Sequence, residues 1–433
     1  MRPAGRWRLS AATTTIVRDV LDNGLRLVTE SMPHVRSVTI GVWLTRGSRH
    51  EPQDHGGIAH FVEHMLFKGT MARSAEDIAQ AIDSIGGQLD AFTAKEYASY
   101  YIKVLDEHLP FALEILSDVI RNPAFRDADI EREKKVILEE IKMVEDTPDD
   151  LVHEVFTQSF WEGHPLARPI LGTKESIEAL TGEALRRYFA GVYTADNFIV
   201  SAVGNIEHAR VRELVQGGFD GVPRSGTPVA DTMPVVVPRT IVRTKELEQS
   251  HICLGVGGYQ QNHGDRYVSY VLNTLLGGSM SSRLFQNVRE KRGLAYAVFS
   301  GLAAYRDAGA FTVYAGCANE AVGEVIDLIV AELKTAKREP VADTELRRSK
   351  DHLKGSLMLG LENTASRMSH LARQEIYFDR QFGLDETLDG IERVTVPELT
   401  RVATDLFSDG GLAATVLGPL DTLALPPERL ALG

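Results

Sequence analysis

Cysteine is almost absent from this 433-residue sequence, which contains only Cys253 and Cys317. Two cysteines allow one disulfide at most, which excludes a disulfide-stabilised scaffold and a cysteine-based zinc site. We therefore expect a reducing compartment and a cytoplasmic protein. Residues 1–18 hold four arginines and no acidic residue. We expect a short basic tail there, although a transit segment would place the protein in an organelle matrix.

Long apolar runs are also missing, so no segment is expected to span a membrane. Positive charge is in deficit, because 47 Lys and Arg stand against 60 Asp and Glu, giving a net charge of −13. This balance disfavours nucleic acid as a partner and is compatible with basic peptides. With 433 residues, 43% of residues hydrophobic and 25% charged, the chain resembles a soluble globular protein of two or more domains.

One short stretch, residues 58–67, combines an apolar stripe with a polar cluster. A helix there places His60, Glu63 and His64 together on the side opposite the stripe. Two imidazoles four residues apart can bind one metal ion, and the carboxylate between them can act on a water molecule. The five residues alone fit a solvated polar face equally well. The stripe consists of Ile58, Phe61, Val62, Met65 and Leu66.

Periodicity and turn residues predict both helices and strands along the first 220 residues. Asp22-Asn23-Gly24 is a strong hairpin turn, and Gly86-Gly87 ends a helix. The predicted strands are 13–17, 25–28, 37–44, two within 86–102 around a turn near Lys95, and 195–205. The predicted helices are 58–67, 75–85, 108–120 and 127–145.

Residues 221–238 are rich in glycine and proline and show little periodicity, which predicts a linker. Beyond it the chain repeats itself: 114–120 aligns with 327–333, and 203–204 with 417–418. We therefore predict an α+β fold of two homologous α/β-sandwich domains, each an antiparallel sheet packed by helices, related by internal duplication. The predicted division is 1–222, a linker at 223–238, and 239–433.

The second repeat lacks the metal-binding residues. The alignment pairs His60 with Asn273, Glu63 with Leu276, and Glu140 with the segment 353–356. A catalytic zinc site usually takes three protein ligands and leaves a fourth position for water. Glu133 and Glu140, seven residues apart on the predicted helix 127–145, share one face at the border of its apolar stripe. Either could be the third ligand.

The sequence resembles the insulinase/pitrilysin family of zinc peptidases, whose motif is the inverzincin H-x-x-E-H. The closest type is the two-domain kind represented by mitochondrial processing peptidase and its bacterial homologues. Residues 60–70, 86–101, 133–140, 276–285 and 289–296 carry the likeness, which extends from about Thr15 to Pro419. The resemblance implies one Zn²⁺ per chain, held by His60, His64 and Glu140, with Glu133 supporting the site.

The resemblance also implies the activity of a zinc endopeptidase on unfolded peptides or peptide extensions. Glu63 would be the general base toward a metal-bound water and then pass the proton to the leaving amine. A peptide would add to an exposed sheet edge. The residues implied for that edge are Asp90, Ala91, Phe92 and Thr93, although the family often has Asn where this chain has Asp90.

Arg289 and Tyr296 match a family arginine and tyrosine that reach the substrate from the far half of a closed chamber. Family chambers contain four such domains, so we expect a homodimer with composite active sites. Two alternatives remain open at this stage. One is a non-catalytic scaffold or assembly subunit of the same fold, and the other is an active subunit that requires a silent partner chain.

Overall fold

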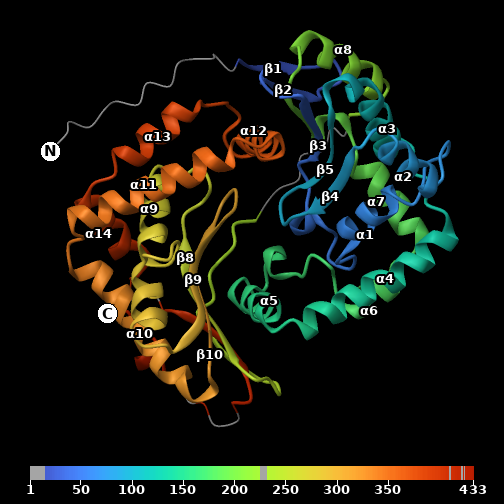
Figure 1. Ribbon diagram of the computed structural model, residues 1–433. Helices are drawn as coiled ribbons and strands as arrows, with labels where there is room; N and C mark the ends of the chain where they lie inside the picture. Colours follow the sequence, from blue (N-terminus) through green and yellow to red (C-terminus); the bar gives the residue numbers. More distant parts are fainter. Residues whose placement is uncertain (1–14, 225–231, 409–410, 421–422, 424) are drawn as a thin grey trace.

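The computed structural model describes residues 15–224, 232–408, 411–420, 423 and 425–433, which form two β-sheets covered by helices (Figure 1). Residues 13 and 14 of the first predicted strand, and the N-terminal tail, lie outside the described residues. In the described part of the chain, no helix combines the length and hydropathy needed to cross a membrane.

The first sheet has six strands in the order β1-β2-β6-β3-β5-β4. Most of its neighbours are antiparallel, but β2 and β6 run parallel. The alternation and turn signals place its strands close to the predicted positions, although residues 195–197 form a 3-10 turn before the last strand. The strands are β1 Ile16–Val20, β2 Arg26–Ser31, β3 Ser37–Leu44, β4 Gln88–Thr93, β5 Ala98–Leu105 and β6 Phe198–Gly204.

The second sheet has five strands in the order β7-β11-β8-β10-β9, which repeats the order β2-β6-β3-β5-β4 of the first sheet without its edge strand β1. Its β7 and β11 are parallel, as β2 and β6 are, and its remaining pairs are antiparallel. This correspondence confirms the α+β fold and the internal duplication. The strands are β7 Thr240–Thr244, β8 Ser250–Gly258, β9 Ala295–Ala304, β10 Gly309–Cys317 and β11 Ala413–Gly418.

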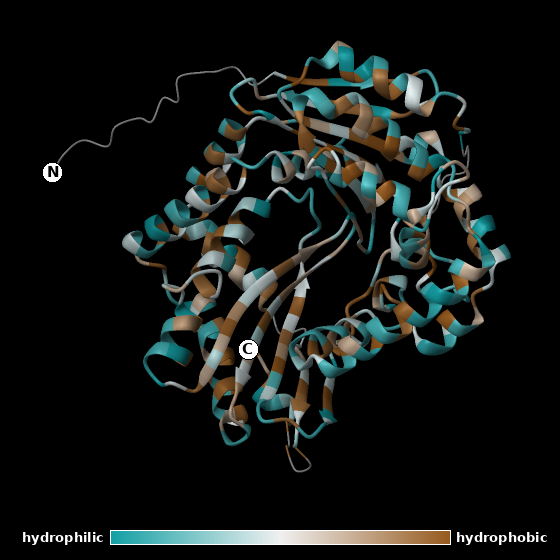
Figure 2. Ribbon diagram, turned by 45° about the vertical axis from the view of Figure 1, so that its right-hand side comes forward, coloured by the Kyte–Doolittle hydropathy of each residue, from teal (hydrophilic) through white to brown (hydrophobic). Residues whose placement is uncertain are grey.

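Helices cover both sheets, and their apolar sides face the strands while polar residues lie outside (Figure 2). In the first half these are α1 Ile58–Leu66, α2 Ala75–Asp83, α3 Leu109–Arg121, α4 Asp127–Asp146, α5 Pro148–Phe160, α6 Lys174–Ala179, α7 Gly182–Val192 and α8 His208–Phe219. In the second half they are α9 Arg266–Leu276, α10 Val322–Arg338, α11 Asp343–Gly360, α12 Thr364–Phe378, α13 Leu384–Glu392 and α14 Val396–Leu406.

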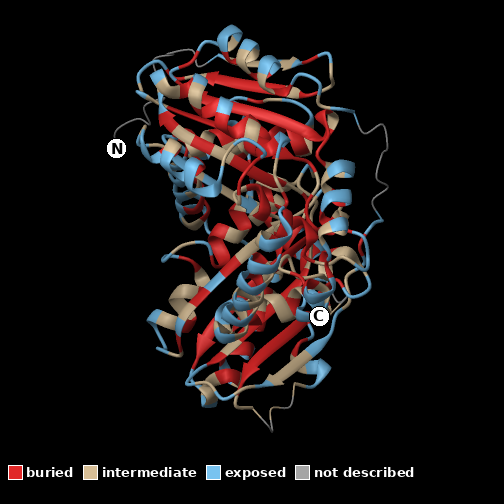
Figure 3. Cartoon of the chain, turned by 90° about the vertical axis from the view of Figure 1, so that its right-hand side faces the viewer, coloured by how far each residue is buried: buried red, intermediate tan, exposed pale blue. Residues whose placement is uncertain are grey.

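Two helices pack on the sheet of the other half, so the cores are not independent. Helix α5 buries Phe156 and Phe160 against β8, β10 and β11 of the second sheet. Helix α12 buries Met368 and Leu371 against β2, β3 and β6 of the first sheet. The central strands of both sheets are therefore buried on both faces, as the red strands in Figure 3 show. The linker between the predicted domains does not separate two independently packed units.

A buried charge cluster also joins the halves. The Arg49 guanidinium lies 2.6 Å from a Glu96 oxygen and 2.8 Å from Asp307 in the β9–β10 turn. Glu96 also accepts the backbone N–H of Arg306 at 3.1 Å. Because Glu96 lies in the β4–β5 turn, this cluster, which we call the Arg49 cluster, ties the second sheet to the edge hairpin of the first.

Candidate metal centre

Helix α1 carries the H-x-x-E-H stretch and is held from two sides. Its apolar stripe is buried in the first core. At its N-terminus the buried Glu51 carboxylate accepts the N–H groups of Gly57 at 3.0 Å and Ala59 at 2.9 Å. Gly57 has φ +88°, a left-handed conformation that favours glycine. The helix axis and rotation are therefore set by packing below and by capping at one end.

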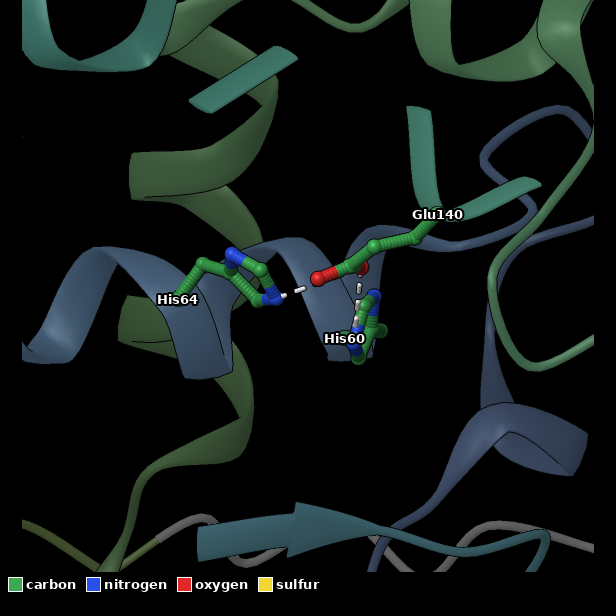
Figure 4. A group of neighbouring side chains, drawn as sticks. All are labelled: His60, His64 and Glu140. Atoms are coloured by element: carbon green, nitrogen blue, oxygen red, sulfur yellow. Dashed lines mark ion pairs between the residues drawn. The ribbon is translucent and has the colours of Figure 1, made fainter. Parts of the chain in front are cut away.

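Helix α4 packs against α1 and brings a carboxylate to the two histidines. Glu140 Oε2 lies 3.8 Å from His60 Nε2 and 3.6 Å from His64 Nε2, as Figure 4 shows. One ligand atom from each residue lies within 4.8 Å of the others. Two imidazole nitrogens and a carboxylate oxygen are the donors of a three-ligand catalytic zinc site.

The Glu140 oxygen and the His60 imidazole of this group are both in states that suit a metal ion. Glu140 Oε2 is buried and has no hydrogen-bond partner among the described residues, a costly state unless a cation lies against it. Burial, followed by the neighbouring His64, lowers the pKa of His60 to about 4. The imidazole of His60 is therefore neutral near pH 7 and has a lone pair to offer.

Glu133 lies behind one of the ligands. His64 Nδ1–H donates to Glu133 Oε2 at 3.1 Å, and Lys68 Nζ pairs with Glu133 Oε1 at 2.8 Å. A proton on Nδ1 leaves the Nε2 lone pair of His64 free, which is the orientation a metal ligand needs. Glu133 therefore contacts the outer nitrogen of His64, whereas Glu140 Oε2 lies near the Nε2 atoms of both histidines.

Glu63 lies between the histidines and strand β4. Burial raises the pKa of its carboxyl group, whereas a hydrogen bond from the Thr93 hydroxyl and the charge of His64 act in the opposite direction. Thr93 donates to Glu63 Oε2, which orients the carboxylate beside the two histidines. A carboxylate with a raised pKa near a zinc-type site is suited to accept and return a proton.

Strand β4, which contains Asp90, Ala91, Phe92 and Thr93, lies at the edge of the first sheet, with no further strand paired outside it in the described residues. Its side chains alternate between exposed and half-buried positions. Asp90 accepts the Tyr101 hydroxyl at 2.9 Å, and Phe92 packs edge-on against Trp43. The strand thus presents an open edge whose last residue, Thr93, contacts the Glu63 carboxylate.

The structure does not bring Arg289 and Tyr296 to this group. Arg289 lies in the π-helix Phe285–Glu290, with its guanidinium 5.4 Å from the centre of the Tyr296 ring. Tyr296 is 77% exposed at the start of β9. At about 3.3 Å per residue, the length of β9 separates it by roughly 25 Å from the β9–β10 turn, which contacts Glu96.

Three contacts of the site are absent from the sequence prediction: the Glu51 cap, the Lys68 pair with Glu133, and the Thr93 bond to Glu63. Lys68 follows α1 by two residues, and the sequence pattern indicates Thr93 only as part of the edge strand. Glu51 precedes the helix by seven residues, outside the usual capping spacing. No local signal indicates it.

The second half holds no comparable group of metal-binding side chains among the described residues. The pairing of His60 with Asn273 is wrong. The buried faces of α1 and α9 match when Ile58 is paired with Val268, which pairs His60 with Tyr270. The error arises because the loop before α9 is shorter than the loop before α1, so one offset does not hold along the chain.

Comparison with known proteins places both halves. Residues 26–174 match Insulinase (Peptidase family M16), and residues 179–353 match the Peptidase M16 inactive domain. The chain is 43% identical to the uncharacterized zinc protease YmxG of Bacillus subtilis, covering 91% of this chain and 96% of that protein. It is 41% identical to an uncharacterized zinc protease of Mycobacterium tuberculosis, with 97% of each chain covered.

Solved structures show the same architecture. A protease from Helicobacter pylori superposes with a TM-score of 0.86 at 25% identity, covering 93% of this chain and 99% of that one. A Pseudomonas fluorescens structure described as a peptidase M16 inactive domain superposes with a TM-score of 0.88 at 20% identity, covering 95% and 100%. The fold, the two matched regions and the close relatives together show that the chain belongs to the insulinase family, peptidase family M16.

Proposed function

We propose that this protein is a zinc-dependent endopeptidase that hydrolyses unfolded peptides or peptide extensions. The observation that carries the proposal is the convergence of His60, His64 and Glu140 with Glu63 directly beside them. Relatives named as zinc proteases support the metal and the reaction class. Zinc, when bound, would lower the pKa of a coordinated water and polarise the scissile carbonyl.

Four residues of the chain would hold or support the metal, and Glu63 would transfer the proton. His60, His64 and Glu140 would hold the metal, and Glu133 would keep His64 in the correct tautomer. Glu63 accepts a proton from the attacking water and returns it to the leaving amine. The raised pKa of Glu63 favours the first of these transfers, because a more basic carboxylate accepts a proton from water more readily.

Strand β4 would bind the substrate. Its open edge offers main-chain N–H and C=O groups to an extended peptide. Such main-chain pairing depends little on the sequence of the peptide. Because β4 ends at Thr93, which touches Glu63, a peptide along the edge would pass the catalytic carboxylate. The net charge of −13 motivates a preference for basic peptides.

Peptide hydrolysis with and without a chelator tests the function. We expect chelation to abolish activity and added Zn²⁺ to restore it. Glu63→Gln should lower kcat by about 10²–10⁴-fold while leaving the metal content unchanged. Unchanged activity in Glu63→Gln would contradict the proposal.

The charge preference is tested by comparing the hydrolysis rates of basic and acidic versions of one peptide at low salt. Equal rates would exclude a preference for basic peptides.

We also propose that the active protein is a homodimer with composite sites. The support is spatial: Arg289 lies in the π-helix before β9 and Tyr296 at the start of β9, which is the end of that strand away from the proposed zinc ligands. They could act on a substrate bound to a partner's centre. Both halves of the machinery are present in one chain, which favours two identical subunits.

A further inference from the structure

The second half contains a cavity where the first half has its metal centre. Matching the buried faces pairs Ile130 of α4 with Leu346 of α11, and therefore Glu140 with Ser356. The strand register likewise pairs Thr93 with Ala304. Ser356, Ala304 and Tyr270, the counterpart of His60, all line one cavity of about 660 Å³.

Helices α12 and α13 complete the walls of this cavity, which we call the α9–α12 cavity. Its remaining polar lining includes Arg266, His370, Arg373 and Thr387. Apolar and aromatic side chains, among them Phe378, form much of the rest. A site of this size with a mainly apolar wall and a few polar groups is typical of small-ligand pockets.

The charge of the lining has one sign. Arg266 and Arg373 contribute two positive charges, and no aspartate or glutamate lines the cavity, although the chain carries 13 more acidic than basic residues. Neither arginine forms an ion pair with a carboxylate among the described residues. Glu386, whose pKa is lowered first by Arg380 and further by Arg266, pairs with Arg380 outside the cavity.

Arg266 is positioned by aromatic rings. Its guanidinium carbon lies 4.4 Å from the centre of the Tyr267 ring and 5.1 Å from that of Phe378. A guanidinium stacked in this way keeps its charge and loses little further freedom on binding an anion. The cavity therefore offers a preformed cation beside an aromatic surface.

Three further polar side chains, those of His370, Gln374 and Thr387, belong to the lining of the cavity. Gln374 is oriented by Phe382, since its Oε1 accepts the Phe382 N–H at 2.9 Å and its Nε2 donates to the Phe382 carbonyl. Its Nε2 also donates to His370 Nε2 at 2.7 Å, which leaves Nδ1–H of His370 as a donor. Thr387 is 9% exposed, and its hydroxyl has no hydrogen-bond partner among the described residues.

We propose that the α9–α12 cavity binds a carboxylate carried on an apolar or aromatic body. Arg266 and Arg373 match the charge of the carboxylate, and Nδ1–H of His370 supplies a donor. The apolar wall takes the body of the ligand. Such a group could be the C-terminal residue of a peptide or a free organic acid. The inference does not depend on the peptidase activity proposed above.

Calorimetric titration of the full-length Glu63→Gln protein tests this binding without cleavage. The probes are N-acetylphenylalanine, its uncharged amide, and a decapeptide ending in phenylalanine as free acid or as amide. We expect each acid to bind at least tenfold more tightly than its amide, a difference of about one charge-assisted hydrogen bond. Tighter binding of the decapeptide acid than of N-acetylphenylalanine would identify a peptide C-terminus as the ligand. Binding of N-acetylphenylalanine without binding of the decapeptide acid would identify a free organic acid as the ligand.

Matched variants locate the site. Arg373→Gln and Ser356→Glu should each weaken binding of N-acetylphenylalanine about tenfold. Arg380→Gln, which alters an arginine outside the cavity, and Ser356→Gln, which adds the same bulk without charge, should change it less than threefold. The proposal is overturned if acid and amide bind equally, if the folded protein binds neither acid, or if Arg373→Gln and Ser356→Glu both bind like the wild type.

Discussion

Glu133 is the residue whose role depends most on its surroundings. It is buried, lies 3.1 Å from His64 Nδ1, and is neutralised by Lys68. Its helical spacing makes it as plausible a metal ligand as Glu140, since both share one face of α4. Only the packing of α4 on α1 shows that Glu140 lies near the histidine Nε2 atoms. Glu133 instead contacts Nδ1, on the other side of the His64 ring.

Replacing Glu133 should therefore weaken metal binding without removing it. We expect Glu133→Gln to lower zinc affinity about 10–100-fold, because a neutral amide holds the His64 tautomer less firmly. Competition with a chelator of known affinity measures this. Glu139→Gln is the matched control, since Glu139 is exposed on the same helix and pairs with Lys142. An affinity equal to the wild type in Glu133→Gln would contradict the supporting role.

At the level of elements, α1 depends on Glu51 as well as on its own apolar stripe. The Glu51 carboxylate is buried and takes two backbone N–H groups at the start of the helix. Burial raises the pKa of Glu51 to about 8, despite those hydrogen bonds. The folded protein therefore holds a proton on Glu51 at pH values where the unfolded chain has lost it.

This proton predicts a pH-dependent stability. The contribution of a raised pKa is fully present below about pH 4.5 and is lost as the pH rises through about 8. Between pH 5 and 8, the free energy of unfolding of the wild type should fall, relative to Glu51→Gln, by about 1 kcal/mol per pH unit. Urea unfolding of the wild type and of Glu51→Gln at three pH values measures the two free energies of unfolding. A difference independent of pH would contradict it.

The elements themselves follow closely from local pattern. The apolar repeat of residues 127–145 matches α4, and the predicted helix 58–67 matches α1 to within one residue. The strand predicted at 195–205 begins three residues late, because 195–197 form a 3-10 turn. Pattern identifies elements well where one face is apolar, since burial of that face is what selects the conformation.

For the whole molecule, the Arg49 cluster is a buried polar connection between the halves. Its three charged side chains are buried or nearly so, with 2%, 3% and 20% exposure for Arg49, Glu96 and Asp307. Removing the cation leaves two carboxylates without their partner in a site of low dielectric. The cost of such a change exceeds that of breaking a surface ion pair.

We expect Arg49→Met to lower the free energy of unfolding by about 3–5 kcal/mol. The control is Arg347→Met, because Arg347 pairs with Glu392 at the exposed surface of α11, where the loss should be below about 1 kcal/mol. Denaturant unfolding of both variants measures the difference. Similar small losses in the two variants would show that the cluster contributes little to joining the halves.

Composite active sites can be tested by mixing subunits. In a mixed dimer of Glu63→Gln and Arg289→Ala, one site combines an intact zinc centre with an intact arginine. We expect partial activity to return, although each variant alone is impaired. Mixed dimers verified by two affinity tags are the material to assay. No recovery in them would exclude a shared site, and a monomeric active enzyme would exclude the homodimer itself.

The sequence alone determined the type of fold, the duplication and the trio His60, Glu63 and His64, because periodicity, turns and short spacings are local properties. Tertiary structure decided what depends on contacts distant in sequence. These are the approach of Glu140 to α1, the bond from Thr93 to Glu63, and the crossed packing of α5 and α12. It also decided that Tyr270, rather than Asn273, occupies the position in the second repeat that His60 occupies in the first. The reason is that the rotation of a helix is set by which residues are buried and not by a constant offset along the chain.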